Sequence, residues 1–404
     1  MRTFVIIGAG LAGTRAAETL RREGFDGRVL LIGEEPDAPY DRPPLSKGYL
    51  TGPVGTAPYL NHVEFYAADG IDLRTGTRVT GLDARSNTVS LDSGERIVFD
   101  RLLVATGASA RTLAVPGADL AGVRYLRTLA DARRLRHDLA AGGRMVVVGG
   151  GWIGTEIAAA ARQRGLDVTL VHRGAMPLAK ALGPEVAAVY RDIHLEQGVH
   201  LVSGDVAEVL GGAAVEAVRL ADGRTLDANV VVAGIGARPR TELAQVAGLA
   251  VDDGVVADER LRTSAPGIFA AGDVAQAWHP RYGTSLRVEH WANALNQGVV
   301  AATNMLGRSA VYERVPYLYS DQYDLEMEYS GYAPRWDRVV FRGDPRERKF
   351  IAFWLDGPRV VAGMNVNVWD VVADIQHLVR RRRRVNPERL ADVSVPLDQV
   401  EQQP

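Results

Sequence analysis

Two glycine-rich turns are the first residues of this 404-residue chain whose types and spacing indicate chemistry. One turn is Gly8-Ala9-Gly10-Leu11-Ala12-Gly13, and the other is Gly149-Gly150-Gly151-Trp152-Ile153-Gly154. In a G-x-G-x-x-G turn the glycines permit a tight bend, a close approach of backbone to pyrophosphate, and close packing of helix on strand. Each turn therefore predicts a dinucleotide site at a helix N-terminus, where unpaired N–H groups attract phosphate.

The apolar patterns on both sides of these turns predict a βαβ unit around each of them. The first unit has expected strands at Phe4–Ile7 and Val29–Ile32 and a helix at Leu11–Arg22. The second has expected strands at Met145–Val148 and Val168–Val171 and a helix at Thr155–Arg164. Because the turns begin 141 residues apart, the chain contains two nucleotide-type folds rather than a short-period repeat.

Short alternating segments after each unit predict a small antiparallel sheet. These segments are 77–82, 88–91 and 97–99 after the first unit, and 206–210, 215–220 and 225–226 after the second. From about Tyr312 the aromatic residues become denser, and the pattern predicts a third, α/β domain. Its expected elements are strands at 338–342, 350–355 and 360–365 and a helix at 368–384.

The composition excludes several classes of chemistry. The chain has no cysteine, so disulfides, thiolate metal sites and thiol nucleophiles are all excluded, and we expect no metal site. The 47 basic and 49 acidic residues leave a net charge of −2, which favours neither a nucleic-acid nor a membrane-surface partner. No apolar run is long enough to cross a bilayer, and the glycines interrupt the apolar N-terminus, so we expect a cytoplasmic protein.

Three further motifs make the chain resemble a known family. They are Pro39-Tyr40-Asp41-Arg42-Pro43-Pro44-Leu45-Ser46-Lys47, Leu103-Val104-Ala105-Thr106-Gly107, and the segment from Thr263 to Asp273 that ends Ala270-Ala271-Gly272-Asp273. These motifs, and the spacing over essentially the whole chain, resemble the FAD-dependent NAD(P)H:ferredoxin reductases that serve oxygenases. That family is placed among the pyridine nucleotide-disulfide oxidoreductases but has no redox disulfide.

The resemblance implies a glutathione reductase-like α/β fold with two Rossmann-like domains and a C-terminal α/β domain. The motif near Asp273 belongs to the fold that begins at Gly8, so the FAD-binding domain is expected to be discontinuous. Its predicted parts are 1–110 and 238–311; the NAD(P)-binding domain is 111–237 and the C-terminal domain is 312–404.

The resemblance also implies which residues contact FAD. Glu34 lies 21 residues beyond Gly13, where an acidic side chain accepts hydrogen bonds from ribose hydroxyls. The other expected contacts are Ala12, Arg42, Lys47, Val79, Ala105, Arg127, Asp273, Glu289, Trp291 and Tyr319. Alternative interpretations remain for two of them, because Arg42 fits an ordinary surface arginine and Trp291 fits a core position.

The second turn predicts a nicotinamide nucleotide as the electron donor. Where relatives that prefer NADH carry an acidic residue at the end of the second strand, this chain has His172 followed by Arg173. Arg173 and a protonated His172 would bind a 2′-phosphate, so we expect NADPH to be accepted alongside or in preference to NADH. The resemblance places Ile235 and Gly236 along the nicotinamide passage.

By the same resemblance, Glu156 lies near the nicotinamide and pairs with Lys47 beside the reactive nitrogen of the flavin; simple helix capping is the alternative for Glu156. Without cysteine, the electrons must leave the chain, and the resemblance names a small iron–sulfur ferredoxin as acceptor. The run Arg380-Arg381-Arg382-Arg383-Arg384 is a predicted docking patch for it, with a solvated helix end as the alternative.

Two other functions remain open at this point. One is an NAD(P)H dehydrogenase that reduces a quinone or small acceptor directly, and the other is a redox-sensing interaction protein like apoptosis-inducing factor. We expect a monomer or weak dimer.

Overall fold

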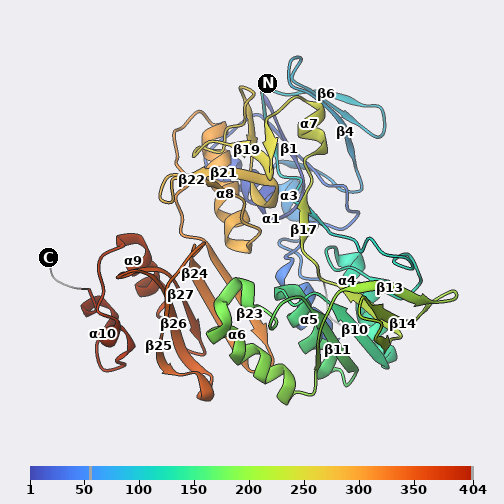
Figure 1. The fold of residues 1–404 in the computed structure, drawn as a ribbon. Coiled ribbons are helices and arrows are strands. Elements are labelled where there is room, and N and C mark those ends of the chain that lie inside the picture. Colours follow the sequence, from blue (N-terminus) through green and yellow to red (C-terminus); the bar gives the residue numbers. More distant parts are fainter. Residues whose placement is uncertain (54–56, 402–404) are drawn as a thin grey trace. The chain divides into compact units, whose positions relative to one another are not determined.

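The computed structural model describes residues 1–53 and 57–401. The chain forms two compact units, each built from three segments (Figure 1). Unit 1 comprises Met1–Arg42, Thr56–Ser109 and Ala237–Arg314, and unit 2 comprises Pro43–Gly55, Ala110–Gly236 and Val315–Pro404. The predicted three-domain division stays a prediction.

A parallel five-stranded sheet with the order β20-β7-β1-β2-β3 forms the centre of unit 1. Except for β3, the strands are almost continuously apolar and buried, as expected of a parallel sheet covered on both faces. Helices α1 and α8 pack against each other beside this sheet (Figure 1). The bounds are β1 Thr3–Ile7, α1 Leu11–Arg22, β2 Arg28–Ile32, β3 Ile71–Arg74, β7 Arg101–Val104, β20 Ile268–Ala270 and α8 Trp291–Met305.

The pairing of β20 with β7 confirms that the segment near Asp273 returns to the sheet that begins before Gly8, since Ile268 aligns with Leu102 and Ala270 with Val104. Smaller antiparallel and mixed sheets surround this one. They contain β4 Val79–Asp83, β5 Thr88–Leu91 and β6 Arg96–Val98; β18 Val251–Asp252, β19 Gly254–Ala257, β21 Ala275–His279 and β22 Thr284–Leu286; and the pair β8 Ala108–Ala110 and β17 Ala237–Pro239. The remaining elements are α3 Val63–Ala68, α7 Glu242–Val246 and η2 Gly272–Val274.

Unit 2 contains a second parallel sheet, with the order β12-β11-β10-β16-β9. Helix α2 packs against α4 and α5, because Leu50 is fully buried in one apolar cluster with Leu135 and Ile157. This packing explains why residues 43–53 belong to unit 2. The bounds are η1 Pro43–Ser46, α2 Gly48–Thr51, β9 Val123–Arg124, α4 Leu129–Ala141, β10 Arg144–Val148, α5 Trp152–Gln163, β11 Asp167–His172, α6 Ala179–Glu196, β12 His200–Ser203 and β16 Val230–Ala233.

Two antiparallel sheets complete unit 2. The three-stranded one contains β13 Val206–Gly211, β14 Val215–Leu220 and β15 Thr225–Asp227, as expected from the sequence. The five-stranded one has the order β23-β24-β27-β26-β25. It packs against α5 and α6 through an apolar cluster that includes Tyr190 and Trp354. Its elements are β23 Tyr317–Gln322, β24 Leu325–Gly331, β25 Arg338–Asp344, η3 Pro345–Glu347, β26 Lys349–Asp356, β27 Arg359–Val366, α9 Val372–Arg381, α10 Pro387–Ala391 and η4 Leu397–Gln399.

The predicted bounds of two helices were wrong. Helix α9 covers Val372–Arg381 and not 368–384, because Arg382 adopts the left-handed conformation that ends the helix. Helix α5 begins at Trp152, three residues before the expected start, because Gly151 already serves as its N-cap. Within residues 1–53 and 57–401, no helix has both the length and the apolarity to cross a membrane.

Candidate functional site

The first glycine turn lies between β1 and α1, and each glycine has its own steric requirement. Gly8 has a positive φ of 113°, and a Cβ there would lie 2.1 Å from the carbonyl oxygen of Ala105. A Cβ at Gly13 would lie 2.0 Å from the carbonyl oxygen of Gly8. Gly8 and Gly13 therefore hold the turn close to β7 and the helix close to the strand.

Gly10 differs from the other two glycines because a Cβ at this position would have no heavy atom within 4 Å. Gly10 is also the N-cap of α1, and no side chain caps the helix there. The turn therefore leaves open space over a helix N-terminus whose N–H groups attract a pyrophosphate. This cradle fits the dinucleotide that the sequence predicts.

The acidic residues after β2 form ion pairs with arginines of unit 1. The carboxylate of Glu34 is exposed and lies 2.8 Å from Arg240 and 3.5 Å from Arg78. Its neighbour Glu35 accepts from the Tyr40 hydroxyl at 2.5 Å and from Arg42 at 2.8 Å.

Arg42 is therefore held by Glu35 and is not an ordinary surface arginine. The ribose contact of Glu34, which pairs with Arg240 and Arg78, stays a prediction. Glu35 was not predicted from the sequence, although it directly follows the predicted Glu34.

Helix α8 positions Trp291 at its first residue, where the indole N–H donates to Asp41 at 2.7 Å. This bond joins α8 to the proline-rich loop that carries Arg42. Asp273 lies in η2, where the N–H of Gly272 donates to the Gln297 side chain of α8 at 2.8 Å. Helix α8 thus fixes both the distal motif and the loop, so Trp291 is more than a core filler.

The remaining predicted FAD contacts have mixed environments. Val79 and Ala105 are buried, so only their backbones or small side-chain faces are available. Glu289 pairs with Arg287. Arg127 lies in unit 2 just before α4, where its N–H donates to Asp131 at 3.2 Å.

The second glycine turn reproduces the geometry of the first within unit 2. Gly149 has a φ of 115°, and a Cβ at Gly154 would lie 1.9 Å from the carbonyl oxygen of Gly149. Gly151 is the uncapped N-cap of α5, and a Cβ there would again have no heavy atom within 4 Å. The exposed side chain of Ile153 follows it. The two turns are therefore matched cradles for two nucleotides.

The end of β11 does not provide the expected protonated histidine. His172 is buried, and this burial lowers its pKa, so its neutral form dominates at neutral pH. Arg173 is 87 % exposed but pairs with Asp205. Of the two predicted partners for a 2′-phosphate, Arg173 alone carries charge, and Asp205 competes for it. Ile235 is exposed and Gly236 has a positive φ of 102°.

Lys47 and Glu156 form a buried ion pair within unit 2. The Nζ of Lys47 lies 2.9 Å from Glu156 Oε2, and only 13 % and 3 % of the two side chains are exposed. Two hydroxyls complete the coordination of this carboxylate, since Ser46 donates to Oε2 at 2.5 Å and Ser320 donates to Oε1 at 2.6 Å. Such a carboxylate is a fixed acceptor, and simple helix capping does not describe Glu156.

Tyr319 belongs to the same cluster because its ring centroid lies 5.5 Å from Lys47 Nζ. The sequence predicts Lys47, Glu156 and Tyr319 as site residues but not the two serines. Ser46 directly precedes Lys47 and Ser320 directly follows Tyr319, so proximity to named residues was the available signal.

The arginine run is exposed, but its five residues do not share one helix. Arg380 and Arg381 close α9, whereas Arg382 adopts a left-handed conformation. The side chain of Arg383 pairs with Glu401 at 3.2 Å, and the backbone of Arg384 forms an isolated antiparallel β-bridge with that of Arg359. The run therefore forms an exposed basic cluster over a helix end and the following extended segment.

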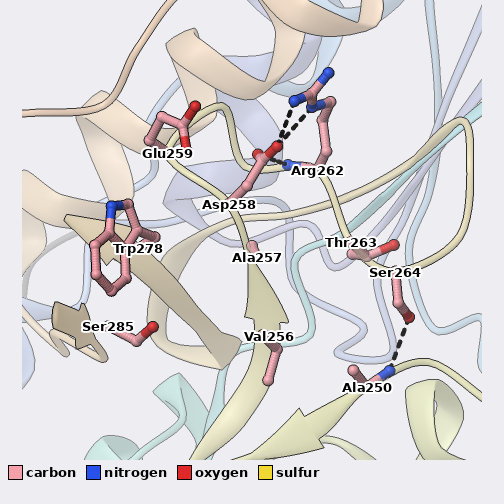
Figure 2. A pocket seen from close by; sticks show the side chains of 10 residues that line it. All are labelled: Ala250, Val256, Ala257, Asp258, Glu259, Arg262, Thr263, Ser264, Trp278 and Ser285. Carbon is pink, nitrogen blue, oxygen red and sulfur yellow. Dashed lines mark hydrogen bonds and ion pairs between the residues drawn. The ribbon is translucent and has the colours of Figure 1, made fainter. Parts of the chain in front are cut away.

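A separate pocket in unit 1 has a volume of about 530 Å³. Figure 2 shows that Asp258 and Arg262 hold each other at its wall and that Trp278 borders it. None of the predicted nucleotide-binding residues lines it. Within the described residues, no group of three His, Cys, Asp or Glu side chains could hold a metal ion.

Comparison with protein families defines the class of protein. The pyridine nucleotide-disulphide oxidoreductase family matches residues 2–298, and a reductase C-terminal domain matches residues 317–400. The chain belongs to this oxidoreductase family, with the glutathione reductase-like α/β fold and C-terminal domain that the sequence predicts.

Particular relatives narrow the comparison. The ferredoxin–NAD(+) reductase component of an anthranilate 1,2-dioxygenase system from Burkholderia cepacia is 40 % identical over 401 residues, which covers 98 % of each chain. Among solved structures, a covalent putidaredoxin reductase–putidaredoxin complex matches with a TM-score of 0.94 and 38 % identity, over 99 % of this chain and 98 % of that one. The ferredoxin reductase for the CYP199A2 system of Rhodopseudomonas palustris matches with a TM-score of 0.96 and 35 % identity, over all of both chains.

Proposed function

We propose that this protein is an FAD-containing NAD(P)H:ferredoxin reductase that supplies an oxygenase system. Two matched glycine cradles in a chain without cysteine carry this proposal. Two nucleotides are bound for redox chemistry, yet no thiol is available to receive the electrons, so the acceptor lies outside the chain. Relatives named as ferredoxin–NAD(+) reductase components, similar over nearly the full chain, support the same conclusion.

The overall reaction converts one NAD(P)H and two oxidised ferredoxins into NAD(P)⁺, two reduced ferredoxins and one proton. Bound FAD supplies the chemistry that converts a two-electron hydride into two single electrons. Residues of unit 1 would hold the flavin nucleotide: the α1 N-terminus would bind the pyrophosphate, Glu34 the ribose, and Asp273 the ribityl chain.

Residues of unit 2 bind and orient the nicotinamide nucleotide. The α5 N-terminus receives its pyrophosphate, while Ile235 and Gly236 border its ring. The ammonium of Lys47, held by Glu156, is a fixed positive charge, which by the family resemblance would act on the reactive nitrogen of the flavin. Hydride transfer depends mainly on the alignment of the two rings. A fixed charge also lowers the barrier, because it does not have to reorganise during the reaction.

The finer choice of nicotinamide depends on Arg173. We propose that NADPH is accepted besides NADH, because Arg173 is exposed and within reach of a nucleotide bound at the end of β11. The neutral His172 and the competing Asp205 argue against a strong NADPH preference.

Docking of the ferredoxin is proposed at the exposed basic cluster of Arg380–Arg384. An acidic ferredoxin would be attracted to these charges, which would raise its association rate at low ionic strength.

Stopped-flow spectroscopy tests the proposal in two stages. The flavin of the purified protein is first reduced with each nicotinamide under anaerobic conditions, and the reduced protein is then mixed with candidate ferredoxins. Fast ferredoxin reduction with slow direct quinone turnover is expected. Faster turnover with a quinone than with every ferredoxin would instead identify a quinone reductase. Slow reduction by both nicotinamides would favour a redox-sensing protein.

A further inference from the structure

A continuous chain of buried hydrogen bonds leads away from the Lys47–Glu156 pair through unit 2. Ser320 contacts Glu156 Oε1 at 2.6 Å, and the Gln322 side-chain nitrogen lies 3.3 Å from Ser320 Oγ. The Gln322 oxygen lies 3.0 Å from His194 Nε2, and His194 Nδ1 lies 3.2 Å from the Tyr323 hydroxyl. Glu156, Ser320, Gln322 and His194 are all buried.

The direction of every hydrogen bond in this chain follows from its two ends. Glu156 pairs with an ammonium and is an acceptor, so Ser320 must donate its proton to it. The oxygen of Ser320 then accepts from the Gln322 amide, whose second N–H donates to Thr155 Oγ1 at 3.0 Å. The Gln322 oxygen is left to accept from His194 Nε2–H.

The tautomer of His194 is therefore fixed, with Nδ1 as the acceptor of the Tyr323 hydroxyl. Burial lowers the pKa of His194 to about 4, so the neutral ring needed for this arrangement is the stable form at neutral pH.

We propose that Gln322 and His194 are positioning residues, which orient the Ser320 hydroxyl onto Glu156 and through it fix the Lys47 ammonium. Without Gln322, the hydroxyl of Ser320 would rotate freely and would also turn away from the carboxylate of Glu156. The amide of Gln322 removes that freedom by occupying the lone pair of Ser320. His194 in turn prevents the Gln322 amide from rotating by 180°, because that rotation would bring two N–H donors together.

Three separate elements, α5, β23 and α6, carry Glu156, Ser320, Gln322 and His194, and Lys47 directly follows η1. Besides Lys47, Asp321 on β23 and Tyr190 on α6 interact electrostatically with Glu156. At the far end, the Tyr323 hydroxyl contacts His194, and Arg162 interacts electrostatically with Tyr323. The variants that test the proposal must therefore leave all of these charges unchanged.

The lysine composition makes a direct measurement possible, because Lys47, Lys180 and Lys349 are the only lysines in the sequence. Selective ¹³Cε labelling of lysine in the full-length protein gives three side-chain signals, which Lys180→Arg and Lys349→Arg assign. Gln322→Leu and Ser320→Ala are expected to move the Lys47 signal, because Glu156 loses the oriented hydroxyl donor that helps to hold it against Lys47.

Ser330→Ala is the matched control, since Ser330 is a buried serine of the same sheet that accepts from Gln376 at 3.3 Å and lies outside the chain. It should leave the Lys47 signal unchanged. His194→Gln keeps a donor for Gln322 and should retain the parent signal, whereas His194→Phe should not. These two variants also serve if Gln322→Leu fails to fold.

An unchanged Lys47 signal in folded Gln322→Leu or His194→Phe would overturn the proposal. The same holds if Ser320→Ala alone moves the signal, because the orientation would then end at Ser320. The inference rests on the proposed function for its catalytic meaning, but the Lys47 signal is measured without turnover. Failure to reduce any ferredoxin would contradict the proposed function, but it would leave the result for this series of hydrogen bonds intact.

Discussion

The hydroxyl of Ser320 donates to the carboxylate of Glu156 at 2.6 Å, across 164 positions of the sequence. Together with Ser46 and Lys47, it gives a buried carboxylate three donors. A buried charge is tolerated when it is paired and hydrogen-bonded, and it becomes costly when a partner is removed. The predicted consequences concern this cluster, the two cradles and the charged surface residues.

Removal of the Lys47 charge should harm both stability and flavin reduction. Lys47→Met leaves Glu156 buried with hydroxyl donors only, and we expect a loss of about 3 kcal/mol in the free energy of unfolding. Flavin reduction by the nicotinamide should slow at least about tenfold because a fixed charge is lost. Denaturant titration and stopped-flow absorbance measure the two effects. Lys180→Met, at an exposed position of α6, should change neither.

Substitutions at Gly10 and Gly151 should each impair the binding of a different nucleotide. Gly10→Val and Gly151→Val introduce matched side chains at extended N-cap positions, φ −80° and −88°, where each Cβ enters open space. We expect both proteins to fold, with a cost of about 1 kcal/mol at the helix N-cap. Gly10→Val should be purified without flavin. Gly151→Val should retain flavin but show a KM for the nicotinamide that is raised more than about tenfold.

The flavin absorbance at purification and steady-state kinetics distinguish these variants. Gly13→Val is the contrasting case, because its Cβ would overlap the Gly8 carbonyl oxygen. It should fail to fold, and a folded, flavin-free Gly13→Val protein would contradict the assigned steric role.

Nicotinamide selectivity should depend on the competition between Arg173 and Asp205. Asp205→Asn removes the competing carboxylate and should raise kcat/KM for NADPH relative to NADH several-fold. Arg173→Gln removes a charge-assisted hydrogen bond and should lower that ratio by about tenfold. Steady-state kinetics with both nucleotides measures the ratio. Equal ratios in the parent and Arg173→Gln would remove Arg173 from the nucleotide site.

Ferredoxin docking should respond to the basic cluster. Arg381→Gln combined with Arg384→Gln should raise the KM for ferredoxin several-fold at low ionic strength, with dye reduction unchanged. The difference should shrink as salt is added, because surface charges are screened. Arg346→Gln serves as control, since Arg346 is 90 % exposed and pairs with Asp344. An unchanged KM in the double variant would indicate a solvated helix end.

Acid stability should depend on His194. Its pKa is about 4 in the folded protein and about 6.5 when unfolded, so between these values the unfolded chain binds more protons and stability falls as the pH falls. At pH 4.5 the loss relative to pH 7 is about 2 kcal/mol from this group. His194→Gln should remove that loss, as measured by urea unfolding at both pH values. His137→Gln, with an 87 % exposed side chain, should retain it.

The local sequence pattern was sufficient to predict those parts of the fold in which consecutive elements pack against each other. The turns at Gly8–Gly13 and Gly149–Gly154 were predictable because strand, turn and helix follow one another directly, and α1 has the expected bounds Leu11–Arg22. Both small antiparallel sheets after the βαβ units were predicted for the same reason. Strand β3 and the sheet that contains β19 and β21 were missed because their short segments lack a strong period.

Tertiary structure decided the features that depend on distant segments. Helix α9 ends at Arg382 because this residue adopts a left-handed conformation, which a run of five arginines does not predict. The neutral state of His172 follows from its burial, which the residue type does not determine.

The sequence by itself determined two nucleotide cradles and, through the lack of cysteine, an acceptor outside the chain. Only the folded chain brings η1, α5, β23 and α6 together so that Glu156 receives Lys47, Ser46 and Ser320. The physical reason is that glycine geometry acts between adjacent residues, whereas desolvation and hydrogen-bond direction depend on every group that packing places around a charge.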